Sequence, residues 1–464
     1  RAKCMLLYAY KRKEIKAAAS SGRARAFQAN IGAVIRPRRQ LLKGADMDSG
    51  TMHLTDEEKE MLRGERGEAV KAALAYQIAV GNFFKAEKFV PVANAHVMAD
   101  IELIGDGGLE FLRRLKALGA SCVVDTTTNA RCMDMQCAAS LGQDSEEMAK
   151  EEEIMRLLEE LRMIRIDSCI NYQTYYQPTL GEHLAWGDTG TVIAANSIFG
   201  ARTNFESGNA SLSAAITGRT PAYGFHLDAC RRGTIEVRLE AEMRDVADWG
   251  ALGKLVGHPH QDYFAVPVFE GVRRRPSPDD LKHLGCALAS YGSMAMYHMV
   301  GVTPEARSRE EAFGGREPQK SMTVTPEDLD KVYQNYAYLD GAENVVVFSG
   351  PQLSIFEMRR LAELFQGRRV AKGMHVFVTT NNSVMSNARR LGYARILEEA
   401  GVQLMEGVCF YLLQNLSGIR KMNGWINLIS NSGKIVNTIT AHRFNTVLRH
   451  TAQCVDIACT GELQ

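Results

Sequence analysis

The sequence predicts an α/β protein built from doubly wound parallel sheets in several subdomains, with a loop-rich region in the centre. Three observations support this fold. Apolar runs of strand length alternate with amphipathic helical segments in the N-terminal third of the chain, and the same alternation returns more regularly after residue 340. The chain has 464 residues, a length typical of about two to four domains.

The composition excludes several classes of partner. The chain is 45% hydrophobic and carries a formal net charge of +1, which gives no argument for a nucleic acid as its main partner. No apolar run approaches the roughly 20 residues of a membrane span. The 10 cysteines form no C-x-x-C pair, so we expect a reducing, cytoplasmic location.

Residues 1–46 differ from the rest of the chain because they are basic, contain Ser and Ala, and are almost free of acidic residues. Such a composition is typical of a transit-peptide remnant, which would make the location organellar. It is also compatible with an unrelated extension. We therefore treat this segment as a separate basic N-terminal extension.

The first structured region shows a β-α-β rhythm. Residues 54–84 predict two helices, the first capped by Thr55 with Glu58 three residues later. The following elements are expected as strand, helix, strand and helix over 89–97, 107–120, 121–129 and 144–164, the first strand ending at His96.

The centre of the chain, residues 165–233, is predicted to be loop-rich. The charged stretch 305–330, punctuated by Gly and Pro, has the composition of a linker. After it, three apolar strands separated by helices predict a doubly wound sheet, whose ligands collect beyond the carboxyl ends of the strands. We therefore divide the chain into a central α/β region, 47–325, and a compact C-terminal subdomain, 326–464.

The stretch 196–228 is dense in Gly, Asn, Ser and Thr, and it contains two arginines. Guanidinium groups bind carboxylates through paired hydrogen bonds, so Arg202 and Arg219 predict a pocket for a small anion. Neighbouring side chains would add neutral hydrogen bonds to that anion. The alternative is a structural polar loop with surface arginines. The candidate residues for these additional bonds are Asn196, Ser197, Thr203 and Asn204.

Chemically reactive side chains follow other predicted strands. Cys169 and Cys409 are candidate thiolate ligands for iron or zinc, against the more common alternative of inert buried thiols. Ser432 and Lys434 lie in the polar turn "NSGK", which suits an activated hydroxyl or an ordinary hairpin turn. His96 is a candidate general acid or base, although a lone histidine is more often structural.

Several segments together resemble one family, among them "AHVMADIELIGDGGLEFL", "GEHLAWGDTGTVIAANSIFGARTN", "AAITGRTPAYGFHLD", "ISNSGK" and "CVDIACTG". This set resembles the large-subunit module of aconitase X, over roughly residues 50–462. The resemblance implies a hydro-lyase that removes water from a small hydroxylated carboxylate. Family substrates are cis-3-hydroxy-L-proline and mevalonate 5-phosphate, and a small swivelling domain, fused or separate, closes over the site.

The resemblance also implies roles for individual residues. Cys169 and Cys409 match cysteines associated with an iron centre, either mononuclear iron or an iron–sulfur cluster. Asn431, Ser432 and Lys434 match the C-terminal serine/lysine turn, and Ser432 is the candidate for the proton step by analogy with the serine base of the superfamily. The anion pocket around Arg202 would hold the substrate carboxylate.

The chain departs from the family pattern in its third loop, which commonly reads Gly-Cys-Pro-His or Gly-Ser-Pro-His. Here it is "SGPQ", so Gly350 and Gln352 replace two side chains with ligating chemistry. Phe205 likewise replaces a usual arginine. We therefore favour a dehydratase most like the cis-3-hydroxy-L-proline type, keep the phosphomevalonate type as an alternative, and retain a catalytically impaired binding protein as a hypothesis of another class.

Overall fold

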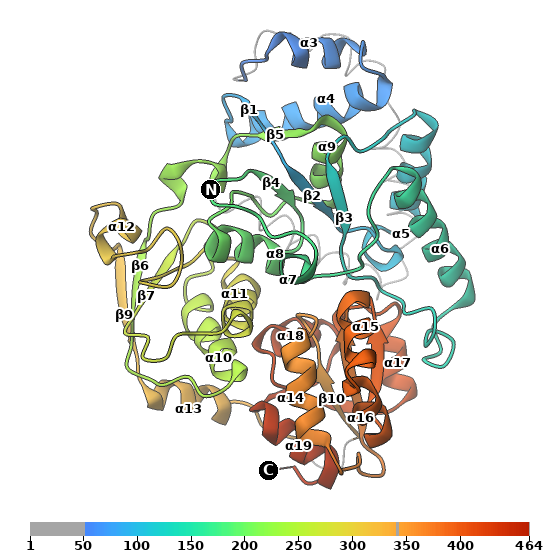
Figure 1. The fold of residues 1–464 in the computed structure, drawn as a ribbon, viewed down its shortest axis with the longest axis vertical. Helices are drawn as coiled ribbons and strands as arrows, with labels where there is room; N and C mark the ends of the chain where they lie inside the picture. Colours follow the sequence, from blue (N-terminus) through green and yellow to red (C-terminus); the bar gives the residue numbers. More distant parts are fainter. Residues whose placement is uncertain (1–51, 340–342, 464) are drawn as a thin grey trace, which may run out of the picture. The chain divides into compact units, whose positions relative to one another are not determined.

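The computed structural model describes residues 52–339 and 343–463, and residues 52–464 form one compact unit. The predicted N-terminal extension, 1–46, lies outside the described residues. The α/β architecture is confirmed, because three parallel sheets and one short antiparallel pair alternate with helices along the chain (Figure 1).

The first part of the unit contains a three-stranded parallel sheet, ordered β3-β2-β4, and the antiparallel pair β1-β5. Thr55 and Glu58 form the predicted capping box at the start of α3. Asp100 caps α5, which therefore begins earlier than predicted and bends at Gly105. The elements are α3 (Asp56–Arg63), α4 (Glu68–Phe84), β1 (Phe89–Pro91), β2 (Asn94–Val97), α5 (Ile101–Ala117), β3 (Asp125–Thr128) and α6 (Ser145–Glu160).

The predicted loop-rich region is more helical than expected. Its elements are α7 (Asn171–Thr174), β4 (Leu184–Trp186), α8 (Thr189–Ala194), the π-helix η1 (Ala195–Phe199), α9 (Gly208–Thr217), β5 (Arg219–Pro221), η2 (Gly224–His226) and η3 (Asp228–Cys230). The predicted loop is wrong for α9, whose small side chains form part of the buried core. That helix is buried along most of its length, because its small residues allow close packing against α4 and β2.

The second part is a four-stranded parallel sheet, ordered β8-β7-β6-β9. The linker predicted at 305–330 is wrong, because this stretch supplies α12, the sheet strand β9 and the start of α13. The elements are β6 (Ile235–Leu239), α10 (Val246–Gly257), β7 (Pro267–Glu270), α11 (Pro278–Gly292), β8 (His298–Met299), α12 (Arg309–Phe313), β9 (Lys320–Val324) and α13 (Pro326–Gln334). The boundary near 325 falls between β9 and α13 and stays a prediction.

The C-terminal part confirms the predicted doubly wound sheet, with five parallel strands ordered β12-β11-β10-β13-β14. Successive residues of β10 enter different apolar clusters, Val346 with α14, α16 and α19, and Val347 with α17 and α18, so both faces are covered. The elements are β10 (Glu343–Phe348), α14 (Ile355–Phe365), β11 (His375–Thr380), α15 (Asn382–Arg390), α16 (Tyr393–Ala400), β12 (Gln403–Glu406), η4 (Phe410–Leu412), α17 (Leu416–Met422), β13 (Trp425–Ser430), α18 (Gly433–Thr438), η5 (Ile439–His442), β14 (Asn445–Leu448) and α19 (Thr451–Thr460).

The strand order places a topological switch point between β10 and β13, where connections leave in opposite directions. The loop after β10 carries Gly350 and Gln352, and the turn after β13 carries Ser432 and Lys434. The two loops are in contact, because Ser432 Oγ donates to the carbonyl of Gly350. The described part of the chain has no helix with both the length and the apolar composition that a membrane crossing requires.

A buried hydrogen bond connects α10 with the start of α19. His450 Nε2 lies 2.8 Å from Asp248 Oδ1, and Tyr333 donates to the same oxygen. This bond raises the pKa of His450 above 6.5. Burial acts to raise the pKa of Asp248, but the bonds from His450, the Arg244 amide and Tyr333 outweigh it, so that pKa lies below 3.8.

We expect His450→Asn to destabilise the protein by about 1 kcal/mol at pH 5.5 and by much less at pH 9. A raised histidine pKa contributes stability below its unfolded value, which is lost as the pH rises through the folded value. Thermal midpoints at both pH values measure this, with the exposed His53→Asn as the control. An equal loss at both pH values would contradict the assignment.

Candidate active site

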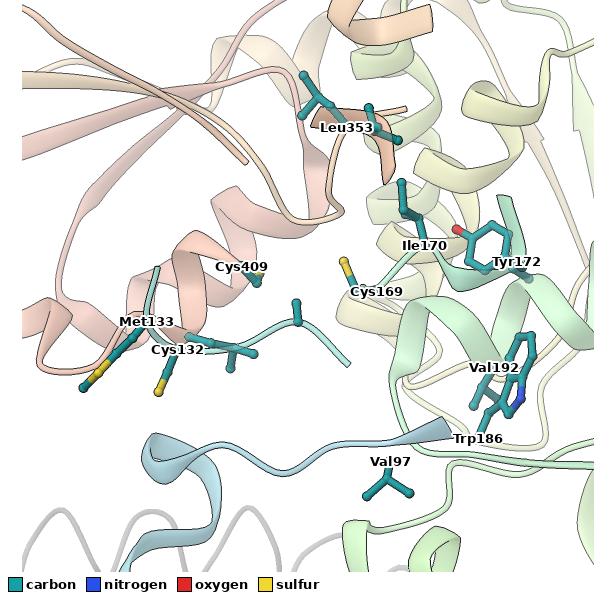
Figure 2. Packing of buried hydrophobic residues seen from close by; sticks show 14 of the residues in the cluster. Val97, Cys132, Met133, Cys169, Ile170, Tyr172, Trp186, Val192, Leu353 and Cys409 are labelled. Atoms are coloured by element: carbon teal, nitrogen blue, oxygen red, sulfur yellow. The ribbon is translucent and has the colours of Figure 1, made fainter. Parts of the chain in front are cut away.

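Two buried thiols from distant parts of the sequence are brought together by one glutamine. The backbone amide of Gln352 donates to Cys169 Sγ at 3.3 Å, and Gln352 Oε1 accepts from the Cys169 amide at 3.0 Å. Gln352 Nε2 donates to the carbonyls of Asp167 and Val408, the second of which precedes Cys409. Figure 2 shows Cys169 and Cys409 on facing segments of the chain.

Burial raises the pKa of both thiols. For Cys169 the neighbouring Cys409 and Asp188 add to this effect, whereas the charge of Lys434 opposes it. Lys434 likewise opposes the shift at Cys409. In the absence of a bound cation, both thiols are therefore protonated at neutral pH.

Lys434 is the positive charge of this neighbourhood. Burial acts to lower its pKa, but Asp188 and the three cysteines Cys286, Cys169 and Cys409 together raise it. Its ammonium lies 3.9 Å from Asp188 Oδ1. Asp188 is itself fixed as the N-cap of α8, accepting from the amides of residues 190 and 191. The ammonium thus lies near one carboxylate and within electrostatic reach of three cysteines.

His96 is buried at the carboxyl end of β2. Its Nδ1 lies 2.8 Å from Thr127 Oγ1 and its Nε2 lies 3.3 Å from Asn129 Oδ1. Burial lowers the pKa of His96 to about 4, against opposing contributions from Asp188, Asn129 and the Ser168 backbone. The imidazole is therefore neutral near pH 7. The contribution of the Ser168 backbone to this pKa indicates that His96 lies beside the segment that carries Cys169.

The serine of the "NSGK" turn serves as a helix cap. Ser432 Oγ accepts from the Ile435 amide at 3.2 Å while it donates to Gly350. The neighbouring Asn431 donates to Thr451 Oγ1 at 2.9 Å. The two side chains therefore join the loops after β10, β13 and β14.

The polar side chains predicted to bind substrate already have hydrogen-bond partners within the protein. Asn196 donates to two carbonyls and accepts from the Thr203 amide and from Arg231. Ser197 accepts from the Tyr297 amide. Thr203 accepts from the Trp186 amide, and Asn204 bonds to Tyr223, Phe225 and Tyr263. These contacts assign a scaffolding role to the set, and its substrate role stays a prediction.

Nor does the structure bring together the two arginines of the predicted anion pocket. Arg219 donates to Glu57 and Glu58 at the start of α3, at 3.0 Å each. Arg202 donates to Asp228 and to the carbonyl of His226. Each guanidinium thus has a carboxylate partner within the chain, and the role of the two arginines in binding substrate stays a prediction.

Other residues of this neighbourhood were missed or undervalued. Cys286 lies on α11 and contributes electrostatically at Lys434. Tyr172 is fully buried, and Cys286, Cys169 and Asp188 act on its hydroxyl. The sequence signal that could have found Tyr172 is its place three residues after Cys169. Cys286 has no such signal, because it lies within a buried helix.

The donor set tests whether iron fits. Cys169 and Cys409 suit a pair of thiolate ligands, but Gly350 has no side chain and every polar atom of the Gln352 amide is bonded within the protein. Among residues 52–339 and 343–463, no group of three or more His, Cys, Asp or Glu side chains is arranged to hold a metal ion. The described residues therefore contain no three-thiolate cluster site, and Cys169 and Cys409 stay candidate ligands for iron.

Comparison with known proteins decides the family. Models of the aconitase X first, second and third domains match residues 51–229, 233–334 and 343–460. The phosphomevalonate dehydratase large subunit of Methanothermobacter thermautotrophicus is 34% identical, over 78% of this chain and 88% of that protein. The chain belongs to the aconitase X family.

Two further relatives extend the comparison. The cis-3-hydroxy-L-proline dehydratase of Pseudomonas aeruginosa is 31% identical, over 76% of this chain and 61% of that protein. The crystal structure of Thermococcus kodakaraensis aconitase X in its holo-form matches with a TM-score of 0.78 and 32% identity, covering 88% of this chain and all of the other. The named relatives are dehydratases, so the predicted hydro-lyase class is confirmed. The name "large subunit" implies a small-subunit partner for some family members.

The three aconitase X domains meet at the thiols. The first supplies Cys169 and Asp188, the second supplies Cys286, and the third supplies Cys409 and Lys434. Two hollows of the described chain lie elsewhere: one includes Trp249 among its lining residues, the other Arg307, and neither contains a residue of this neighbourhood. The site itself is a domain junction with buried thiols, since Cys169 is 4% and Cys409 is 7% exposed.

Gly190 has no side chain, and a larger residue at this position would crowd Cys286, Asp188 and Lys434. A Cβ atom there would lie 2.9 Å from Cys286 Sγ, 3.1 Å from Asp188 Oδ2 and 3.8 Å from Lys434 Nζ. We expect Gly190→Ala to lower the free energy of unfolding by about 1–3 kcal/mol through overpacking and to reduce turnover.

The control is Gly107→Ala on α5, where a Cβ atom meets nothing within 4 Å. Because alanine has a higher helix propensity than glycine, the free energy of unfolding of this control should rise by about 0.5–1 kcal/mol. Thermal midpoints of both variants measure the difference. A Gly190→Ala protein as stable and active as wild type would show that the junction is looser than described.

Proposed function

We propose that this chain catalyses the elimination of water from a small β-hydroxy carboxylate, most like cis-3-hydroxy-L-proline. The observation that carries the proposal is the convergence of Cys169, Cys409, Lys434 and Asp188 at the junction of the three aconitase X domains. This junction combines candidate ligands for a Lewis-acidic iron with the opposite charges of Lys434 and Asp188. Both features favour the departure of a hydroxyl group.

The reaction balances as a β-elimination. A base removes the proton from the carbon next to the carboxylate, the C–O bond to the hydroxyl breaks and a C=C bond forms. The departing hydroxide takes up one proton and leaves as water, so the proton removed and the proton delivered balance. We assign the proton step to Ser432, whose oxygen is held in place by Gly350 and Ile435. Lys434 stabilises negative charge beside it, and neutral His96 orients the surrounding hydrogen bonds.

Cys169 and Cys409 would hold the iron centre. An iron centre supplies Lewis-acid polarisation of the hydroxyl that leaves. A small swivelling-domain subunit is the partner that the proposal requires, by analogy with the relatives named as large subunits.

The charge of the junction supports a substrate with one carboxylate. Lys434 is the cation that acts on both thiols, and it is already paired with Asp188. A phosphate dianion would require further donors of positive charge. The phosphomevalonate type is nevertheless the second candidate, because relatives of that name reach 34% identity over most of their length.

A catalytically impaired binding protein is the competing hypothesis from another class. Gly350, Gln352 and Phe205 motivate it, because each replaces a side chain that the family pattern uses. This hypothesis differs from the dehydratase in two measurable respects, because it requires neither bound iron nor turnover.

The first test is an assay with two substrates. We expect the chain, purified with its small-domain partner and iron, to convert cis-3-hydroxy-L-proline to the dehydrated cyclic product. Loss of substrate and formation of product are followed by chromatography. If only mevalonate 5-phosphate is converted, the second candidate function is supported instead. If neither compound is converted, the proposed function is contradicted.

The second test is the iron content of cysteine variants. We expect Cys169→Ser and Cys409→Ser each to remove most of the bound iron, because each removes one of two thiolate ligands. Cys459→Ser, on α19 and half-buried, is the matched control and should retain iron. Iron content unchanged in all three variants would contradict the assignment of the two ligands.

A further inference from the structure

Tyr172 carries a buried hydroxyl without a hydrogen-bond partner. The side chain is 2% exposed, and no described residue bonds to its Oη. Its electrostatic neighbours are Cys286, Cys169 and Asp188, together with Asp279. In Figure 2 the hydroxyl oxygen lies on the side of the ring that faces Ile170, the residue after Cys169. The hydroxyl therefore lies within the candidate active site.

A second unpaired donor belongs to the same neighbourhood. Asn129 is 5% exposed, and its Nδ2 has no partner within the described chain. When His96 carries its proton on Nε2, Asn129 Oδ1 accepts a hydrogen bond from it. The two N–H groups of the Asn129 amide are then the ones without a partner. The Ser168 amide donates to the carbonyl of Thr128 at 3.2 Å, which places the following residue, Asn129, next to the segment that carries Cys169.

Orphaned donors of this kind require an explanation. Most buried polar groups in folded proteins are paired, and an unpaired one is costly. Tyr172 and Asn129 supply two such donors near the segment that carries Cys169, a thiol on which the positive charge of Lys434 acts. The complementary ligand is an oxygen anion, because a carboxylate accepts several hydrogen bonds and carries the opposite charge.

We propose that Tyr172 and Asn129 form the carboxylate subsite of this enzyme and donate hydrogen bonds to the substrate carboxylate. The inference rests on the proposed function and deepens it by naming the group that is bound. It assigns to the domain junction the task that the sequence interpretation gave to Arg202 and Arg219, whose guanidiniums are paired within the chain.

The deciding variant is Tyr172→Phe, which removes only the orphaned oxygen. Because that oxygen has no partner in the free protein, the thermal midpoint of the variant should equal or exceed that of wild type. Its affinity for cis-3-hydroxy-L-proline should fall about 10- to 100-fold, the effect of one hydrogen bond to a charged group. The methyl ester of the same compound should bind both proteins within about 3-fold, since it lacks the charge.

Tyr333→Phe is the matched control. Tyr333 donates to Asp248 at 2.7 Å, far along the sequence from the thiols, so its removal should lower the thermal midpoint and leave affinity unchanged. Asn129→Ala is the second variant, and it should weaken binding of the acid more than binding of the ester. Titration calorimetry and thermal denaturation supply the two measurements, and turnover is recorded in parallel.

The possible outcomes distinguish a failure of the proposed carboxylate subsite from a failure of the proposed function. Wild-type turnover of cis-3-hydroxy-L-proline with unchanged affinity in Tyr172→Phe would overturn the subsite alone and assign the hydroxyl to internal water. A lower midpoint with unchanged affinity would likewise show a structural role. Wild-type protein that neither binds nor converts the acid would overturn the inference together with the hydroxyproline assignment.

Discussion

The saturated side chain of Gln352 is the constraint on which the site depends. It joins the Cys169 segment of the first domain to the Cys409 segment of the third through bonds at its amide oxygen, its amide nitrogen and its backbone. Such bonds are buried, so breaking any of them leaves a polar group without a partner. The distance between the two thiol segments is therefore set by one residue at the end of β10.

A second buried network fixes the same loop from the side of α11. Lys282 is fully buried, donates to the carbonyl of Gln352 and pairs with Asp279 and Glu357. Burial acts to raise the pKa of Glu357, but Lys282 and His283 outweigh it and hold that pKa at about 2. Because a buried charge without its partner is costly, the loop cannot move without disturbing all three domains at once.

The alternation of apolar runs and helical segments predicted the sheet of the C-terminal part, and the family resemblance predicted that Cys169 and Cys409 belong to one site. The stretch 196–228 is harder to interpret, because residues suited to bind an anion are also suited to hydrogen-bond a tight scaffold. Arg202 and Arg219 illustrate the reason, since their partners are Asp228, Glu57 and Glu58, and Glu57 and Glu58 are more than 160 residues away from Arg219 in the chain. Composition does not reveal such pairings.

Close backbone contacts complete the junction. Gly250 on α10 and Gly433, between Ser432 and Lys434, approach so closely that a Cβ atom on either would lie within 3 Å of the other's backbone. Small residues thus allow α10 to pack closely against the turn that carries Ser432 and Lys434. Packing this tight argues against a void left around the unpaired donors. The orphaned atoms of Tyr172 and Asn129 are thus better explained by binding than by loose packing.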